Sequence, residues 1–304
     1  MSRPELGAAL RAGEFIVAPG IHDMIAAVLS NKVGFDFVYA SGFWLTASTY
    51  GLPDAGIATY TQMLDRVSTL TRIVKAGVIA DADTGYGGLL NVHHTVLGYE
   101  AAGVAAIQIE DQEFPKKCGH TPNKRVTPVE DMVEKVKVAC AARANPDAML
   151  VIARTDARQP EGFESAVRRG LAYAEAGADI VFLEALESEA EMREACARIR
   201  KPMMANMADG GKSPIRSKSE LAAIGFALAI FPSITGLAAA AATENALQIL
   251  KAEGTSVSPK LPLFNFREFT SLIGFEEVWA FERRWARPQK RDIEKTTVSS
   301  SEAP

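Results

Sequence analysis

A short pattern that recurs five times along this sequence constrains its fold more than any other feature. In each copy, a helix-forming segment ends in glycine and is followed by a short apolar run that closes on small or acidic residues. Glycine readily takes the left-handed conformation that ends a helix. A short run that is apolar on both faces is typical of a parallel strand buried under helices. The glycines are Gly34, Gly77, Gly103, Gly177 and Gly225, and the runs cover residues 35–42, 78–85, 104–111, 178–185 and 226–233.

Three further runs, residues 15–19, 149–156 and 202–207, raise the number of expected strands to eight. Amphipathic segments such as residues 61–75 and 164–175 separate the strands. Eight alternating strand and helix units predict an α/β fold, a closed (β/α)8 barrel of the TIM type. The alternative is an open doubly wound sheet, which normally carries a glycine-rich phosphate loop after its first strand. The sequence Ala-Pro-Gly-Ile-His at that point does not match such a loop.

The repeat ends well before the end of the 304-residue chain. Barrels of this type reach about 250 residues as one unit, so we expect a catalytic barrel domain over residues 1–254. A helical C-terminal extension is expected over residues 255–286, because its stretch 264–285 is rich in aromatic residues. The polar residues 287–304 are expected to be a disordered tail.

Composition excludes several classes of function. A net charge of −4 gives no basic surface for nucleic acid or an anionic membrane. The most apolar stretch, residues 221–242, is interrupted by glycine and proline and falls short of a membrane span. Residues 1–5 do not resemble a signal peptide. Cys118, Cys140 and Cys196 are too few and too scattered for a disulfide framework or a zinc site, so we expect a cytoplasmic protein.

Polar residues gather where the expected strands end, which is where barrels of this type carry their active sites. Acidic side chains and an arginine that converge on one rim would repel each other or lie unpaired without a bound cation and anion. We therefore expect a metal ion and an anionic ligand at this rim. The residues concerned are Tyr39, Ser41, Gly42, Asp81, Asp83, Glu110, Asp111, Arg154, Thr155, Asp156, Glu184 and Asn206.

Asp81 and Asp83 are the candidate metal ligands. Alternate residues of a strand face the same way, so both carboxylates should point into the mouth of the barrel. Two close carboxylates favour a hard cation, and a site with only oxygen ligands suits Mg²⁺, or Mn²⁺ in its place. Glu110 on the next strand could complete the site directly or through water. The alternative is that these acids cap a helix or pair with lysine and arginine.

A long basic loop, residues 114–125, follows the fourth strand. Its charge and its glycine are typical of a lid that closes over an anionic substrate. Cys118 lies between Lys116 and His120, so we expect its pKa to be depressed and its thiol to act as a proton donor or a nucleophile. The alternative is an ordinary solvated loop with an incidental thiol.

Arg154 is an expected partner for a substrate carboxylate, because a guanidinium buried at a strand end requires an anion. A structural pair with Glu184 or Asp156 is the alternative, and both interpretations can hold together. Ser41 and Gly42 could offer backbone N–H groups to an oxyanion, or they could form a simple tight turn.

These motifs together resemble the isocitrate lyase/phosphoenolpyruvate mutase superfamily. The resemblance covers residues 15–285 and rests on Tyr-Ala-Ser-Gly at 39–42, Asp-Ala-Asp-Thr-Gly-Tyr-Gly at 81–87, Ile-Glu-Asp at 109–111 and Lys-Lys-Cys-Gly-His at 116–120. The last motif is similar to the lyase branch, which includes 2,3-dimethylmalate lyase, methylisocitrate lyase and the petal death protein.

The resemblance implies a barrel whose eighth helix is swapped between subunits of a homotetramer, a dimer of dimers. It implies that Asp81 and Asp83 hold Mg²⁺. Glu110 and Asp54 would either bind the ion through water molecules or contact the residues that hold it. Cys118 would be the general acid, and Tyr39 matches a residue proposed as a base in some members. The matching substrate contacts are Ser41, Gly42, Phe43, Gly119, His120, Arg154, Glu184 and Asn206, where Phe43 departs from the usual glycine.

The implied function is a Mg²⁺-dependent carbon–carbon lyase that acts on a small 2-hydroxydicarboxylate, of the 2-alkylmalate or methylisocitrate type, and yields a 2-oxo acid such as pyruvate plus a carboxylate. Cleavage between C2 and C3 needs a base at the C2 hydroxyl and an acid at C3. An oxaloacetate hydrolase or decarboxylase in the same site is the alternative within enzymes. A barrel that binds ligands without catalysis is the alternative outside them.

Overall fold

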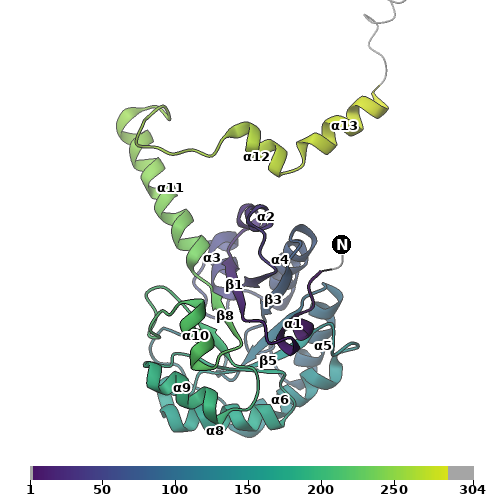
Figure 1. Cartoon of the computed structure of the whole chain (residues 1–304), viewed down its shortest axis with the longest axis vertical. Coiled ribbons are helices and arrows are strands. Elements are labelled where there is room, and N and C mark those ends of the chain that lie inside the picture. Colours follow the sequence, from purple (N-terminus) through teal and green to yellow (C-terminus); the bar gives the residue numbers. More distant parts are fainter. Residues whose placement is uncertain (1–2, 287–304) are drawn as a thin grey trace, which may run out of the picture. The chain divides into compact units, whose positions relative to one another are not determined.

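The protein, described here over residues 3–286 of a computed structural model, contains eight parallel strands around a common axis (Figure 1). The strands pair in sequence from β1 to β6, β7 pairs with β8 and β8 with β1, and a single parallel bridge between Val181 of β6 and Met203, just before β7, connects the two remaining edges. The predicted (β/α)8 barrel is confirmed, and the open sheet is not observed. The strands are β1 Ile16–Ile21, β2 Phe37–Ala40, β3 Gly77–Asp81, β4 Ala106–Glu110, β5 Leu150–Thr155, β6 Ile180–Leu183, β7 Met204–Asn206 and β8 Leu228–Phe231.

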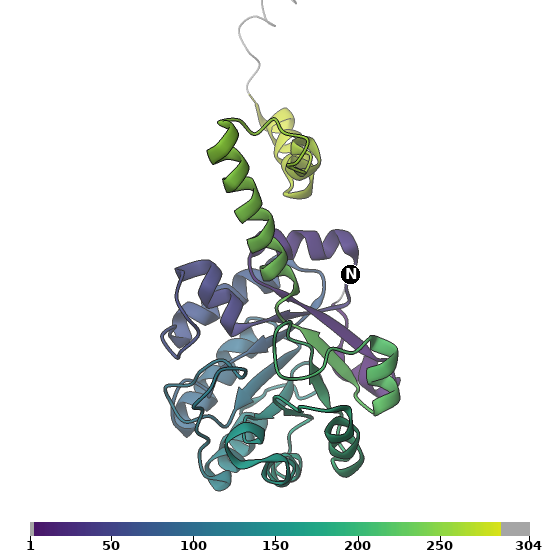
Figure 2. The ribbon, with the colours of Figure 1, turned by 90° about the vertical axis from the view of Figure 1, so that its left-hand side faces the viewer.

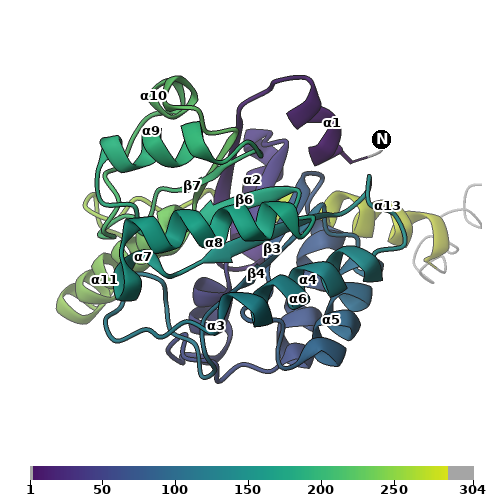
Figure 3. The same ribbon diagram turned by 90° about the horizontal axis from the view of Figure 1, so that it is seen from below.

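Helices lie on the outside of the strands, as Figures 1 and 3 show. Among residues 3–286 none of them combines the length and the hydropathy that a membrane crossing requires. The helices of the barrel unit are α1 Leu6–Arg11, α2 Met24–Val33, α3 Gly42–Tyr50, α4 Tyr60–Ile73, α5 Leu89–Ala101, α6 Val129–Ala142, α7 Arg158–Glu161, α8 Phe163–Glu175, α9 Glu189–Arg198, α10 Lys218–Ile224 and α11 Ile234–Glu253.

The strands bury side chains on both faces, in two separate layers. One layer fills the inside of the barrel with residues such as Phe37, Ile79, Ile152 and Phe182. The other lies between the strands and the helices and uses the alternate positions. Because side chains of a strand alternate in direction, the positions two residues beyond the inner layer face the mouth of the barrel. This alternation places the polar residues of the site.

Four of the five predicted glycines take the left-handed conformation at or just after the end of a helix, with φ between 80° and 118°. Gly77 is the exception, and the prediction for it was wrong. Helix α4 ends at Ile73, and Gly77 is the first residue of β3. A Cβ atom at Gly77 would lie 2.8 Å from the ring of Phe37, so glycine is needed here for close packing of β3 on β2.

The chain divides after Gly254 into two units. Figure 2 shows α11, the last helix of the first unit, with its first turn at the strands and its later turns projecting away from them. The second unit contains α12 Phe266–Leu272 and α13 Phe275–Trp285, which lie in the stretch expected to be helical. The tail expected to be disordered, residues 287–304, lies outside the described residues.

Candidate active site

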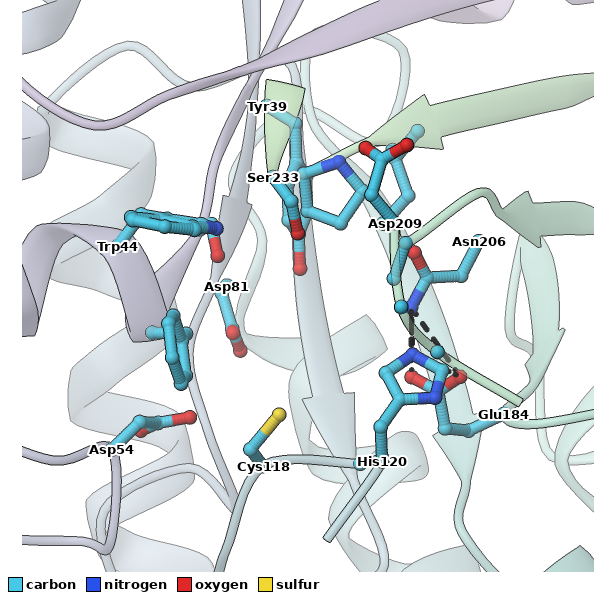
Figure 4. Close-up of a pocket in the computed structure, with 18 of the residues that line it drawn as sticks. Tyr39, Trp44, Asp54, Asp81, Cys118, His120, Glu184, Asn206, Asp209 and Ser233 are labelled. Atoms are coloured by element: carbon cyan, nitrogen blue, oxygen red, sulfur yellow. Dashed lines mark hydrogen bonds and ion pairs between the residues drawn. The ribbon is translucent and has the colours of Figure 1, made fainter. Parts of the chain in front are cut away.

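A cavity of about 260 Å³ lies at the carboxyl ends of the strands. It brings together the residues predicted from several strand ends and from the loop after β4. In Figure 4, Asp81 and Asp54 lie on one side, Glu184, Asn206 and His120 lie on the other, and Cys118 lies between them. The predicted site residues that line it are Tyr39, Ser41, Phe43, Asp54, Asp81, Glu110, Cys118, Gly119, His120, Arg154, Glu184 and Asn206.

Strand alternation explains why these side chains meet. Asp81, Glu110 and Arg154 each lie two residues after an inward-facing position of their strand, and the cross-strand register pairs Glu110 with Arg154. All three are at least nine-tenths buried. Glu184 and Asn206 follow the inner residues Phe182 and Met204 in the same way.

Asp83 reaches the cavity by a different route from the one predicted. It lies beyond the end of β3 and has a left-handed backbone with φ of 50°, so strand alternation does not orient it. Its backbone N–H donates to Asp81 Oδ1 at 3.0 Å. The two carboxylates nevertheless both lie beside Gly42. A Cβ atom at Gly42 would lie 2.9 Å from Asp81 Oδ2 and 3.3 Å from Asp83 Oδ1. A non-glycine residue held in this strained conformation is typical of a functional site.

Asp54, Asp81 and Asp83 form an acid cluster, and Lys116 is the cation that neutralises it. Its Nζ lies 2.7 Å from Asp83 Oδ1 and also contacts Asp54. Burial, offset in part by Lys116, raises the pKa of Asp83 to about 7. Within residues 3–286, no three acidic, histidine or cysteine side chains come together as a ready-made metal site. The basic character of the loop is visible in the sequence, but the pairing of Lys116 with these acids was not predicted.

Arg154 is held by carboxylates on three sides. It donates to both oxygens of Asp156, at 2.8 and 3.0 Å, and its nitrogens lie 3.3 Å from Glu110 and from Glu184. The predicted structural pairs are therefore present. Its Nη1 makes no hydrogen bond or ion pair within the part of the chain that the structure describes. One donor thus stays free for a ligand.

Lys124 pairs with Asp156, the carboxylate that also holds Arg154. Its Nζ lies 2.8 Å from Asp156 Oδ1 with both side chains fully buried, and it also donates to the carbonyl of Gly119. Although burial alone would raise it, Arg154 and Lys124 hold the pKa of Asp156 below its usual value. Asp156 therefore stays ionised and fixes both cations.

Asp111 faces the opposite way from its neighbour Glu110 and organises the layer outside the strands. It accepts hydrogen bonds from Thr155 Oγ1 at 2.6 Å, from Tyr173 at 2.7 Å and from Arg169 at 3.3 Å. These contacts fix the ends of β4 and β5 to α8. Only one feature of the sequence pointed to this network, the pair of adjacent acids after an apolar strand.

The loop after β4, residues 113–125 and hereafter the β4 loop, closes over the cavity. An antiparallel bridge between Gln112 and Val126 joins its two ends. Gly119 lies against Arg154 and Glu184, where any side chain would collide with both. The position of the loop over the rim matches the predicted location of a lid.

His120 connects the β4 loop to the loop after β7. Its Nδ1 accepts the backbone N–H of Lys212 at 3.3 Å, so a neutral ring carries its proton on Nε2. Nε2 lies 3.5 Å from Glu184 Oε1 and 3.3 Å from Asn206 Nδ2. Asn206 donates to Glu184 at 3.0 Å, while its own Oδ1 is buried without a partner in the described residues. That oxygen is available to a donor on a ligand.

The pKa of Cys118 is raised, and the predicted depression was wrong. Burial is the main cause, and it outweighs the backbone N–H of His120 and the charge of Arg154, which lower the pKa. The expected lowering by Lys116 fails because that ammonium is paired with Asp54 and Asp83. Cys118 is therefore a protonated thiol at neutral pH, which suits a proton donor better than a nucleophile.

Tyr39 is buried on β2, and its hydroxyl donates to Gln108 Oε1 at 3.1 Å. Burial and the nearby charge of Asp81 raise its pKa well above the usual value for tyrosine. This direction favours a neutral hydrogen-bond donor over a phenolate base.

Ser41 and Gly42 begin helix α3 and do not form the tight turn considered above. The backbone N–H of Gly42 donates to Asp81 Oδ2 at 3.2 Å, so it is directed at the acid pair. The side chain of Phe43 lines the cavity and is 37% exposed.

Comparison with known protein families gives one match over most of the chain. A family model described as phosphoenolpyruvate phosphomutase matches residues 7–251. The curated 2,3-dimethylmalate lyase of Eubacterium barkeri is 42% identical over 91% of this chain and 96% of its own length. The 2-methylisocitrate lyase of Aeropyrum pernix is also 42% identical, over 91% of this chain and 88% of its own length.

Solved structures agree with this match. An oxaloacetate acetylhydrolase in complex with the inhibitor 3,3-difluorooxalacetate superposes with a TM-score of 0.87, at 32% identity, over 92% of this chain and 95% of its own. A phosphonopyruvate hydrolase in complex with oxalate and Mg²⁺ superposes with a TM-score of 0.83, at 32% identity, over 93% of this chain and 98% of its own.

Proposed function

Because this chain belongs to the phosphoenolpyruvate phosphomutase family, within the phosphoenolpyruvate mutase/isocitrate lyase superfamily, we propose that it cleaves a small 2-hydroxydicarboxylate into a 2-oxo acid and a carboxylate. Relatives that are 42% identical over 91% of the chain are lyases, which confirms the family and the carbon–carbon lyase class expected from the sequence. One observation carries the choice of reaction: a protonated thiol, a free arginine donor and an acid cluster line one cavity.

The acid cluster fits a divalent metal ion, Mg²⁺ or Mn²⁺. Asp81 and Asp83 would hold the ion, and Glu110 and Asp54 would act through water. The donors are all oxygen atoms, which such ions prefer, and Asp81 has no cationic partner among the described residues. A superfamily structure with bound Mg²⁺ supports the assignment. When bound, the metal ion would lower the pKa of the C2 hydroxyl and stabilise the 2-oxo acid.

The polar residues opposite the acid cluster would hold the substrate. Arg154 Nη1 donates to a substrate carboxylate, while Asp156 and Lys124 keep the guanidinium in place. Asn206 Oδ1 accepts a hydrogen bond from a substrate hydroxyl or a protonated carboxyl group. We give Tyr39 the role of a hydrogen-bond donor in this site, because its raised pKa makes the phenolate base costly.

Cleavage requires two proton transfers. The C2 hydroxyl gives its proton to a rim carboxylate such as Glu110, which lines the same cavity. The C2–C3 bond then breaks, C2 becomes a carbonyl carbon, and the bonding electrons pass to C3. The Cys118 thiol protonates C3. After the products leave, the protonated rim carboxyl group returns its proton to solvent and the thiolate regains one. The β4 loop excludes water during the transfer.

Turnover with purified enzyme tests this proposal. We expect pyruvate from 2,3-dimethylmalate or a related 2-methylmalate, or from methylisocitrate, in the presence of Mg²⁺. Cys118→Ser should lower kcat by about 10² to 10⁴, the usual range for loss of a general acid, while metal binding is retained. Cys140→Ser is the matched control, because Cys140 lies on α6, does not line the cavity and donates to the carbonyl of Gly177. A folded enzyme that cleaves none of these substrates contradicts the proposal.

Hydrolysis of oxaloacetate is the second candidate, since the solved oxaloacetate acetylhydrolase is 32% identical with a TM-score of 0.87. That reaction would release oxalate and acetate, whereas decarboxylation of oxaloacetate would release pyruvate and carbon dioxide. Product analysis with oxaloacetate distinguishes the three reactions. The cytoplasmic location and the homotetramer with a swapped eighth helix stay predictions, and size-exclusion chromatography with light scattering tests the tetramer.

A further inference from the structure

The loop that follows β3 has a backbone conformation that residues other than glycine rarely adopt. This segment, residues 82–88 and hereafter the β3 loop, joins β3 to α5. Four of its residues have a positive φ, which is 50° for Asp83, 84° for Gly85, 57° for Tyr86 and 147° for Gly87. A left-handed backbone is unfavourable for a residue with a Cβ atom, so Asp83 and Tyr86 need support from the rest of the fold. This support bears on the site, because the backbone of the β3 loop places Asp83 in the acid cluster.

All five carbonyl groups from Asp81 to Gly85 accept a hydrogen bond. Two of the donors are backbone N–H groups. Gly85 donates to Ala82, and Glu110 donates to Asp83, both at 2.9 Å. The other three donors are side chains of α5 and α6, which pack side by side on the outside of the barrel (Figure 3). The conformation of the β3 loop therefore depends on two helices outside the strands.

Two of the side-chain donors come from α5. The hydroxyl of Tyr99, which is fully buried, donates to the carbonyl of Asp81 at 3.2 Å. Because this bond uses the one hydrogen of that hydroxyl, the Tyr86 hydroxyl, 3.1 Å away, is the donor to Tyr99. Thr95 Oγ1 donates to the carbonyl of Gly85 at 3.4 Å. Helix α5 thus ties the β3 loop at its start, its middle and the ring of Tyr86.

The third side-chain donor is Lys135 on α6, whose Nζ lies 2.8 Å from the carbonyl oxygen of Thr84. Lys135 makes no ion pair with any residue that the structure describes, and burial lowers its pKa. A half-buried ammonium without a carboxylate partner is costly. The bond to Thr84 offsets this cost, since a hydrogen bond from a charged donor is stronger than one from a neutral hydroxyl. Lys135 is therefore the strongest of the three donors.

We propose that Thr95, Tyr99 and Lys135, hereafter the outer brace, position the Asp83 carboxylate at the point where a divalent metal ion binds. This inference rests on the metal site of the proposed function and assigns it three positioning residues. None of the three lines the cavity, so each acts through the backbone of the β3 loop. When a brace bond is lost, the loop can relax out of its left-handed conformation, and the Asp83 carboxylate then moves away from Asp81.

Mn²⁺ binding to the full-length protein without substrate tests the outer brace. The electron paramagnetic resonance signal of free Mn²⁺ gives the dissociation constant, and loss of binding in Asp83→Asn places the ion at the acid cluster. Lys135→Met should raise the dissociation constant by about 10- to 100-fold, the usual cost of losing a group that orients a metal ligand. The increase should be smaller for Tyr99→Phe and smallest for Thr95→Val, whose bond is the longest. Lys135→Arg keeps a charged donor and should restore most of the affinity.

Two control variants separate positioning from a general loss of stability. Lys137→Met changes the same residue type on the same helix, but Lys137 is exposed. Tyr173→Phe removes a buried hydroxyl that bonds Asp111 at 2.7 Å, away from the β3 loop. Both should keep the wild-type Mn²⁺ affinity, even where thermal unfolding shows that Tyr173→Phe is less stable. An equal loss of affinity in Tyr173→Phe and Tyr99→Phe overturns the inference.

Hydrogen exchange at the backbone amides of residues 82–88 keeps this inference distinct from the metal assignment. If the wild-type protein binds no Mn²⁺, the metal assignment fails, while faster exchange in Lys135→Met than in Lys137→Met still shows that the outer brace holds the loop. If the wild-type protein binds Mn²⁺ and the brace variants bind it as tightly, the proposed function stands and the outer brace fails. Turnover gives a further check: in Lys135→Met the Mn²⁺ concentration for half-maximal rate should rise, and kcat should approach the wild-type value at saturating Mn²⁺.

Discussion

Replacing Gly119 by alanine would place a methyl group inside the ion pair that the β4 loop covers. The added Cβ would lie 2.7 Å from both Cγ and Oε2 of Glu184, and closer still to Arg154 Nη2. Ordinary contacts to a Cβ atom begin near 3.4 Å. Neither neighbour can move aside easily, because Arg154 is fixed by Asp156 and Glu184 is fixed by Asn206.

The backbone of the β4 loop must therefore retreat by roughly 1 Å, since close-packed groups yield little. Cys118 immediately precedes Gly119 and moves with the loop. A misplacement of about 1 Å in a reacting group costs about 100-fold in rate. We expect kcat/KM of Gly119→Ala to fall by about this factor while the fold is retained.

Two measurements check this expectation. Pyruvate release, followed through a coupled lactate dehydrogenase reaction, gives kcat/KM. The rate of Cys118 alkylation by iodoacetamide should increase in the variant, because the displaced loop exposes the thiol. Gly88→Ala is the control: this glycine has φ of −79° and open space around a Cβ atom. Wild-type kcat/KM together with a wild-type alkylation rate in Gly119→Ala would refute the reasoning.

Three further predictions follow from the buried charges. The pKa of the Cys118 thiol is raised, so its alkylation should reach half its maximal rate above the pH of about 8.5 typical of a free thiol; Cys118→Ser supplies the background, and a midpoint below that pH contradicts it. Lys124→Met should lower the free energy of unfolding in urea by about 3 kcal/mol at neutral pH, since it removes one partner of a buried pair. The pKa of Asp156 is lowered in the folded protein, so this pair stabilises above the unfolded value of 3.8 and the difference should shrink as pH falls below it; a loss that does not change with pH is evidence against the pairing. Tyr173→Phe removes the 2.7 Å hydrogen bond to Asp111 and should cost about 1 to 2 kcal/mol by the same assay, and unchanged stability would show that the bond does not matter.

Periodicity was enough to predict the barrel and the residues that meet at its mouth. Parallel strands of one sheet end on the same side, so Asp81, Glu110, Arg154, Glu184 and Asn206 had to converge once the strands were identified. Whether Arg154 pairs with protein or with ligand could not be predicted in the same way, because its partners come from three different strands. In the structure Arg154 pairs with carboxylates of the protein, and its Nη1 stays free among the described residues.

Long-range contacts account for two of the three predictions that failed. The pKa of Cys118 was expected to fall because lysine is close in sequence, but Lys116 is paired with acids from two other segments. Asp83 was assigned to a strand, yet its left-handed backbone turns it out of the alternation. Gly77 was read as a helix end, but packing against Phe37 is what requires glycine there. The failures at Cys118 and Gly77 thus concern contacts between residues that are distant along the chain, whereas the failure at Asp83 is a local feature of its backbone.

Glu110 and Asp111 are adjacent in the chain and serve opposite sides of the barrel wall. Insertion or deletion of a single residue earlier in β4 would exchange them, so that the anchor of α8 would enter the cavity and the cavity acid would face the helix. Both the chemistry and the stability of the enzyme would be lost at once. Evolution can therefore alter the specificity of such a barrel by substitution and through its loops, whereas the length of this strand is fixed.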